Sequence, residues 1–286
     1  MSPSLAHAIP EIKKNYNSLN WWRNRVFVPH IVGPVTRLNP QWPSYQDAIH
    51  VMDEEWDNLI VLDACRADEF EKVANLDQFD SYERVVSLGS HSSEWTRRNF
   101  ANDEFGDTVV VSANPHTAKV AGNSFHDIIP LWEVAFDDEE GTVLPEDVVE
   151  AALEASEKYP QKRLIVHFMQ PHAPFVGTEI TDIDDPENYW KAYRDTLEYG
   201  LSNAIDLAEE LSGRTVFTAD HGELNTGKIL STLGIDCHRP KLRHPGLVVV
   251  PWAVINGERR ETSTDSVRSA ESGVINDRLR DLGYKV

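Results

Sequence analysis

The sequence predicts an α/β fold with a largely parallel central sheet and helices on both of its faces. Short, nearly continuous apolar runs recur along the 286 residues, and such runs are typical of strands that are buried on both sides. Segments with helical periodicity lie between these runs. Because strands that alternate with helices form βαβ units, we expect most of the strands to be parallel.

The predicted strands are the apolar runs at residues 58–62, 108–111, 163–168, 214–218 and 247–250. Pro251 is expected to end the last strand, because proline has no amide proton to donate to a neighbouring strand. Ligands of such sheets bind beyond the carboxyl ends of the strands, so the polar residues that follow each run are the first candidates for a functional site.

Two helices are predicted between the strands. Residues 145–158 begin with Pro145 and two acidic residues, which suit the first turn of a helix. A longer helix is predicted between Tyr189 and Leu211, where apolar residues recur at spacings of three and four, and Gly213 is expected to end it. No repeat, low-complexity segment or linker interrupts the pattern, so residues 51–286 are predicted to form one domain.

Residues 1–50 are punctuated by prolines and are predicted to form an irregular N-terminal extension. This part has no uninterrupted apolar run, which argues against a signal peptide or a spanning helix, and we expect a cytoplasmic protein. Trp21, Trp22 and Arg23 are expected to dock the extension onto the domain. Peripheral contact with a membrane is the alternative.

The chain is acidic, with 47 Asp and Glu residues against 27 Lys and Arg residues and a formal net charge of −20. This excess resembles proteins of salt-loving microbes, and an ordinary acidic cytosolic protein is the alternative. A nucleic-acid partner is not expected, because binding to a phosphate backbone needs clustered basic residues. The two cysteines, Cys65 and Cys237, are too few for a disulfide scaffold.

Asp63 follows the first predicted strand, and Asp220 and His221 follow the fourth. A buried Asp at such a place needs a partner, a metal ion or a helix N-terminus to cap. Carboxylate oxygen and imidazole nitrogen together suit zinc or manganese. His172 follows the third strand between Pro171 and Pro174, which restrict the backbone and the direction of the imidazole.

Ser90 lies near the start of a predicted helix that includes Glu94 and Trp95. Backbone N–H groups and the positive end of a helix suit an oxyanion or a phosphate group. An ordinary serine cap is the alternative explanation for this motif.

Taken together, these motifs resemble the alkaline phosphatase/sulfatase superfamily, and within it the short sulfatase-like proteins common in halophilic archaea. The resemblance covers about residues 57–252, and the segment 277–284 resembles the closing helix of such proteins. It implies that residues 51–286 form an alkaline phosphatase-like catalytic domain that uses a divalent metal, whether zinc, manganese, magnesium or calcium. The resemblance implies one metal site and leaves a second one open.

The resemblance also implies a role for each candidate residue. The expected metal ligands are Asp63, Ser90, Asp220, His221 and His238. Ser90 would be the nucleophile, with Ser92 as the alternative, and His172 would contact the ester oxygens as a catalytic and substrate-binding residue. His238 is preferred to His244 as the late histidine. Arg66 would either bind the substrate anion or pair with Asp68 or Glu69.

Sulfatases that use formylglycine carry Cys or Ser followed by x-Pro-x-Arg, and none of Cys65, Cys237 and Ser90 has that context. An unmodified serine favours phosphoryl chemistry. We therefore expect a metal-dependent hydrolase of phosphate (or sulfate) esters that acts on a small anionic ester. The alternatives are a transferase that modifies phospho-headgroups or glycans in envelope biogenesis, and a non-catalytic relative that binds an anion.

Overall fold

The computed structural model describes residues 12–22, 26–27, 30–31, 39, 41–225, 238 and 240–267. The helix predicted at residues 277–284 lies outside the described residues, as do Arg23 and Cys237.

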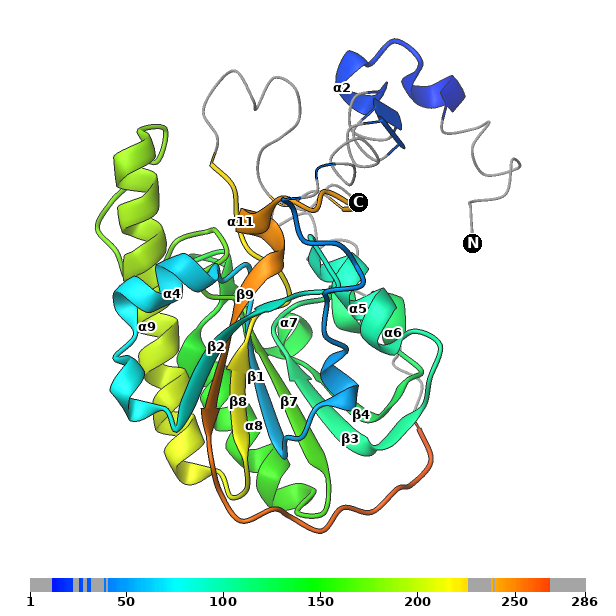
Figure 1. The fold of residues 1–286 in the computed structure, drawn as a ribbon, viewed down its shortest axis with the longest axis vertical. Coiled ribbons are helices and arrows are strands. Elements are labelled where there is room, and N and C mark those ends of the chain that lie inside the picture. Colours follow the sequence, from blue (N-terminus) through cyan, green and yellow to red (C-terminus); the bar gives the residue numbers. More distant parts are fainter. Residues whose placement is uncertain are drawn as a thin grey trace.

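A mixed sheet forms the centre of the described part of the chain, with its strands in the order β2-β9-β8-β1-β7-β3-β4 (Figure 1). The strands are β1 (Asn58–Leu62), β2 (Ser81–Val86), β3 (Phe105–Ser112), β4 (Phe125–Pro130), β7 (Arg163–Phe168), β8 (Thr215–Thr218) and β9 (Val249–Ile255). The pairs β8-β1, β1-β7, β7-β3 and β3-β4 are parallel, whereas β9 is antiparallel to both β8 and β2. The prediction of a largely parallel sheet is confirmed.

The principal helices are α4 (Ala67–Val73), α5 (Ser92–Phe100), α6 (His116–Ala121), α8 (Pro145–Lys158) and α9 (Pro186–Glu210). The connections through α4, α8 and α9 lead toward the β2 edge of the sheet, and those through α5 and α6 lead toward the β4 edge. Right-handed crossovers in opposite directions place their helices on opposite faces. Accordingly α9 packs against α4 and α8, while α5 packs against α6 (Figure 1). The prediction of helices on both faces is confirmed.

Local sequence accounts for these elements. Every residue of β1 is buried, because this strand lies between β7 and β8. The predicted helix at residues 145–158 coincides with α8. The longer predicted helix is α9, whose N-cap Asp185 accepts hydrogen bonds from the amides of Glu187 and Asn188. Gly213, with φ of +95°, follows the end of α9 in the left-handed conformation that glycine favours.

The prediction for the last strand is wrong at both ends. Residues 245–248 form a short helix, α11 (Pro245–Val248), and β9 runs through Pro251 to Ile255. The register explains why Pro251 is tolerated: β8 pairs with residues 253–255 of β9, so at Pro251 the strand has only β2 as a neighbour. A strand with one free edge accommodates a residue that lacks an amide proton.

Shorter elements complete the described chain: α2 (Leu19–Trp22), α7 (Leu131–Val134), the two-stranded sheet of β5 (Phe136–Asp137) and β6 (Thr142–Val143), and the 3-10 helices at Val51–Asp53 and Leu76–Gln78. Residues 43–45 of the predicted extension are bound to the domain, since buried Arg243 donates to the carbonyl oxygens of Pro43 and Ser44. Within the described ranges, no helix combines the length and apolarity that crossing a bilayer requires.

Candidate metal centre and active site

Asp63 directly follows β1, and its side chain is fully buried. Its Oδ2 atom accepts a hydrogen bond from Asn114 Nδ2 and lies 3.3 Å from His167 Nε2. Burial favours the neutral acid, but the imidazoles around it, first that of His167, outweigh burial and hold the pKa of Asp63 below its ordinary value. The carboxylate is therefore ionised and suited to bind a cation.

The chain turns sharply after Asp63. Ala64 has φ of +62°, in the left-handed region that alanine seldom adopts. Its amide donates to Asp220 Oδ1 at 3.1 Å, and its carbonyl accepts from Tyr193 Oη at 2.7 Å. Because Ala64 directly follows Asp63 and its amide binds the Asp220 carboxylate, this turn holds the two carboxylates near each other.

Three buried side chains form a group that could hold a metal ion. Asp63, His167 and Asp220 each offer one ligand atom, and these atoms lie within 4.8 Å of one another. Within the described part of the chain, Asp63 Oδ1, Asp220 Oδ2 and His167 Nε2 are buried without a hydrogen-bond partner. Such atoms are costly unless another group satisfies them. Two carboxylates and an imidazole fit a divalent cation such as zinc or manganese.

Sequence reasoning missed His167, because it considered only residues beyond the ends of strands. His167 lies inside β7, in register with Val61 of β1 and Ser112 of β3. Burial lowers the basicity of its imidazole, but the neighbouring Asp63 carboxylate outweighs burial and raises the pKa of His167 above its ordinary value. The available signal was a single histidine in an otherwise apolar, buried strand, since such a side chain needs a polar partner.

His221 lies beside the same carboxylates. Its Nε2 atom is 3.4 Å from Asp220 Oδ2 and 3.7 Å from Asp63 Oδ1. Its Nδ1 atom is 2.7 Å from the carbonyl oxygen of Gly222, which only accepts hydrogen bonds, so Nδ1 carries the proton in a neutral ring and Nε2 carries a lone pair. The structure thus brings together Asp63, Asp220 and His221, three of the five ligands expected from the sequence, and adds His167 to them.

The serine beside this group is Ser92. Its Oγ atom lies 3.2 Å from His221 Nε2 and 3.5 Å from Asp63 Oδ2. Ser90 Oγ instead donates to Glu94 Oε2 at 3.0 Å. Ser90 lies near the start of the helix as expected, but it precedes the first helical residue, Ser92, by two positions. The structure therefore favours Ser92 over Ser90 for the role of nucleophile, which the sequence had suggested for Ser90.

His172 and His238 form a second cluster next to the first. Their Nε2 atoms lie 3.4 Å apart, and His238 Nδ1 lies 3.2 Å from Glu223 Oε2. Burial and the neighbouring His238 lower the pKa of His172. Burial also opposes the charged form of His238, but the Glu223 carboxylate outweighs it and raises the pKa of His238. The His238 ring lies 4.9 Å from the His221 ring, which places both clusters in one site.

Two candidate residues have structural roles. His244 caps α11, accepting from the amide of Gly246, and packs against Trp42, so His238 is the late histidine of the site. Arg66 donates two hydrogen bonds to the Asp68 carboxylate and one to the carbonyl oxygen of Glu223. The expectation that Arg66 binds the substrate anion is not supported, because its guanidinium is already occupied by these acceptors.

His91 and His116 are further residues that sequence reasoning missed. His91 is the N-cap of α5, and its Nδ1 atom accepts from the amide of Ser93. Its ring lies 5.0 Å from that of His116 and 5.3 Å from that of His238. Burial, together with the basic groups nearby, lowers the pKa of His116 to about 3. At neutral pH the imidazole of His116 is therefore uncharged, and it lines one side of the site.

Comparison with solved structures identifies the fold. The chain matches the integral membrane lipooligosaccharide phosphoethanolamine transferase A (EptA) of Neisseria meningitidis with a TM-score of 0.55 and 13% identity, over 70% of this chain and 47% of that one. It matches the periplasmic domain of EptC from Escherichia coli, solved in complex with zinc, with a TM-score of 0.51 and 12% identity, over 71% and 72% of the two chains. A protein of the alkaline phosphatase superfamily from Vibrio parahaemolyticus matches with a TM-score of 0.47 and 16% identity, over 73% and 62%.

The chain has an alkaline phosphatase-like fold. The structural neighbours thus bear out the fold that the superfamily resemblance implied, and at identities below 25% they show the fold alone. The chain spans about half the length of the EptA structure. No family model matches the sequence, and no curated protein matches it.

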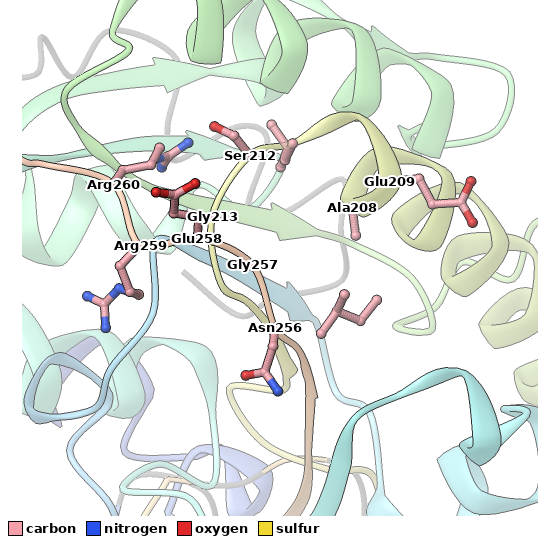
Figure 2. Close-up of a pocket in the computed structure, with 11 residues that line it drawn as sticks. Ala208, Glu209, Ser212, Gly213, Asn256, Gly257, Glu258, Arg259 and Arg260 are labelled. Carbon is pink, nitrogen blue, oxygen red and sulfur yellow. The ribbon is translucent and has the colours of Figure 1, made fainter.

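In this alkaline phosphatase-like fold the candidate site lies at the carboxyl ends of the parallel strands. Figure 2 shows a cavity of about 600 Å³ at the opposite end, between the end of α9 and the chain that follows β9. Arg260, which lines this cavity, donates to the carbonyl oxygens of Asp57 and Lys162 and so joins the loops at that end. Arg260 therefore has a structural role in this cavity. The buried carboxylates and imidazoles of the candidate site lie at the other end of the sheet.

Proposed function

We propose that this chain is a metal-dependent enzyme that cleaves phosphate (or sulfate) esters with Ser92 as its nucleophile. One observation carries the proposal: three buried ligand atoms of Asp63, His167 and Asp220 converge without hydrogen-bond partners, and the Ser92 hydroxyl lies beside them. A fold alone does not specify a reaction, but this arrangement of side chains does support one.

Asp63, His167, Asp220 and His221 would hold the cation. Bound there, a divalent cation would lower the pKa of a neighbouring hydroxyl and offset negative charge on the ester. Ser92 is the first residue of α5, so it lies at the positive end of the helix dipole, which favours an anionic group there.

The bond-making step would be the attack of Ser92 Oγ on phosphorus after its proton has passed to solvent, in line with the departing alcohol. The P–O bond to the alcohol breaks and the departing oxygen takes up a proton. Water would then attack phosphorus, break the bond to Ser92 Oγ, release the phosphate and return a proton to the serine. His238, kept basic by Glu223, would carry a proton at Nε2 toward the oxygens of the ester, and His172 Nε2 would stand beside it.

The first test is metal content together with turnover. Elemental analysis of the purified protein should find about one divalent metal ion per chain. The protein should turn over p-nitrophenyl phosphate or its bis ester faster than p-nitrophenyl sulfate, because the serine lies outside a formylglycine context. A protein that binds no metal and cleaves none of the three esters would contradict the proposal and favour an anion-binding relative.

His167 gives the metal assignment a sharper test. His167→Ala should lose metal, because it removes the nitrogen from the convergent group. His244→Ala is the matched control, since it removes a half-buried imidazole that caps α11 away from the group and should keep its metal. Its expected cost is that of a lost cap, about 0.5–2 kcal/mol of unfolding free energy. Equal metal content in the two variants would exclude His167 as a ligand.

Transfer to an acceptor alcohol is the second candidate function, because the matches with the higher TM-scores are phosphoethanolamine transferases. The two functions share every step up to the release of the group. Adding an acceptor such as glycerol separates them: a hydrolase releases one phosphate for each p-nitrophenol, whereas a transferase releases less phosphate as the acceptor concentration rises.

A further inference from the structure

The segment before residue 32 exposes an unusual amount of apolar side chain. Ile12, Tyr16, Leu19 and Trp22, which we call the N-terminal apolar surface, expose 38%, 63%, 87% and 37% of their area. Of the eight large apolar side chains exposed in the described part of the chain, six lie in residues 12–31, and only Val134 and Ile183 lie elsewhere. Scattered exposed apolar residues need no explanation, but a concentration in one short segment indicates a binding surface.

The charge of this segment is opposite to that of the rest of the chain. Residues 1–40 contain five Lys and Arg residues and one acidic residue, so their net charge is +4. The whole chain carries −20, which leaves −24 on residues 41–286. Lys13 and Lys14 are exposed within the apolar surface itself. A basic, aromatic segment on an acidic protein is a pattern of interfacial membrane anchors.

Local contacts give this surface a defined shape. The Trp22 indole N–H donates to the carbonyl oxygen of Tyr16 at 3.0 Å, and the rings of Trp21 and Trp22 meet edge to face with centroids 5.0 Å apart. Ser18 Oγ accepts from the amide of Trp21 near the start of α2. In Figure 1, α2 lies beyond the carboxyl edge of the sheet, the edge that carries the candidate site.

We propose that the N-terminal apolar surface binds a lipid bilayer that contains anionic lipid. Aliphatic side chains such as Leu19 and Ile12 gain free energy in the acyl boundary, aromatic rings suit the headgroup level, and the lysines attract anionic headgroups. The acidic domain does not prevent this contact, because repulsion beyond a Debye length of about 8–10 Å is screened. The inference does not depend on the proposed enzymatic function.

The same observations argue against two other binding partners for the N-terminal apolar surface. A nucleic acid would leave Leu19 and Ile12 in water and would be repelled by the net charge of −24 on the rest of the chain. A second copy, docked face to face, would bring two segments of +4 together, since a two-fold interface pairs each surface with itself.

The test is flotation of the full chain with vesicles, begun at about 0.1 M salt, where the charge of the acidic domain is screened beyond about 10 Å, in a buffer that leaves its far-UV circular dichroism unchanged. Vesicles of phosphatidylcholine alone are compared with vesicles that also contain phosphatidylglycerol, and the salt concentration is then raised. The wild type should float with the phosphatidylglycerol vesicles, and its partitioning should fall as salt increases. Lys13→Gln and Lys14→Gln should each weaken partitioning about fivefold.

The double variant Leu19→Glu/Trp22→Glu should weaken partitioning about tenfold or more, because it places carboxylates at the acyl boundary. Val134→Glu is the matched control: it changes another apolar residue, 74% exposed and outside the segment, and should float like the wild type. Two results would overturn the proposal. One is a wild type that stays with the unbound protein on phosphatidylglycerol vesicles, and the other is a wild type that forms a dimer without vesicles that Leu19→Glu abolishes.

Discussion

The Ser92 hydroxyl has two neighbours of different character. His221 Nε2, at 3.2 Å, presents a lone pair, and the ionised Asp63 carboxylate lies at 3.5 Å. One proton on the hydroxyl can satisfy only one of these acceptors at a time. A divalent cation held by Asp63, His167, Asp220 and His221 would remove the conflict, because it would supply the positive charge that a single proton cannot give to both acceptors. The same atoms thus argue for a metal ion and for an activated serine.

Ser92→Ala should lower kcat by several powers of ten on any ester that the wild type cleaves, because catalytic residues that act as a unit are not replaced by their neighbours. Ser90→Ala is the matched control, two residues before Ser92 and just ahead of α5, and should keep most of the activity. Steady-state kinetics of both variants decides between them. If Ser90→Ala were inactive and Ser92→Ala active, the original assignment to Ser90 would be restored.

At the scale of elements, the position of α5 depends on a single carboxylate. Glu94 is buried; its Oε1 accepts from Tyr45 Oη at 2.6 Å and from Arg98 Nε at 3.1 Å. Its Oε2 accepts from Ser90 Oγ at 3.0 Å and from the amide of Lys241 at 2.8 Å. Glu94 therefore ties the helix that carries the serine to residue 45 and to the segment that follows His238.

Glu94→Gln keeps the size of the side chain but replaces an accepting oxygen with an NH₂ group that would face donors. The free energy of unfolding should fall by about 1–3 kcal/mol, the usual cost of a buried polar mismatch. Urea denaturation measures it. Arg98→Gln, which alters only the half-exposed partner, should change the stability by less than about 1 kcal/mol. Equal losses in the two variants would mean that Glu94 contributes no more than a surface ion pair.

At the scale of the whole molecule, the chain after β9 crosses the end of the sheet opposite the site (Figure 1). The amide of Ser263 donates to the carbonyl oxygen of Gln161, and that of Asp265 donates to Gly106. Buried Lys162 donates to the carbonyl oxygens of Gly106 and Ser263 and to the Asp265 carboxylate. One ammonium group thus joins this crossing segment to the strands beneath it.

Lys162→Met should lower the free energy of unfolding by about 1–3 kcal/mol, because it leaves carbonyl oxygens without their donor. Asp265→Asn should cost less, since that side chain is more than half exposed. Lys162 holds the pKa of Asp265 below its ordinary value, so the contribution of the pair is present above that value and is lost as the pH falls through the lowered pKa. Thermal unfolding at several pH values measures both effects, and a Lys162→Met protein as stable as the wild type would show that the segment is dispensable.

How well the sequence predicts the structure differs between elements and individual residues, for physical reasons. Periodicity locates α8 and α9, because burial of one helix face imposes a regular spacing. It also brings out Asp63, Asp220 and His221, because polar residues directly after apolar runs mark strand ends. It misplaces the end of β9 at Pro251, since the pairing that tolerates a proline there depends on contacts between distant segments. His167 was missed because register across three strands decides what its side chain meets.

Few residue types are expected to be tolerated at position 64. Ala64 occupies the left-handed region between the two carboxylates, where a β-carbon costs about 1–2 kcal/mol and a branched one costs more. Glycine would adopt this backbone more easily, and the freedom that it adds to the unfolded chain, about 0.4–1 kcal/mol, offsets only part of that gain. In a saturation library selected for folded protein, glycine should therefore survive beside alanine, and valine, isoleucine and threonine should disappear.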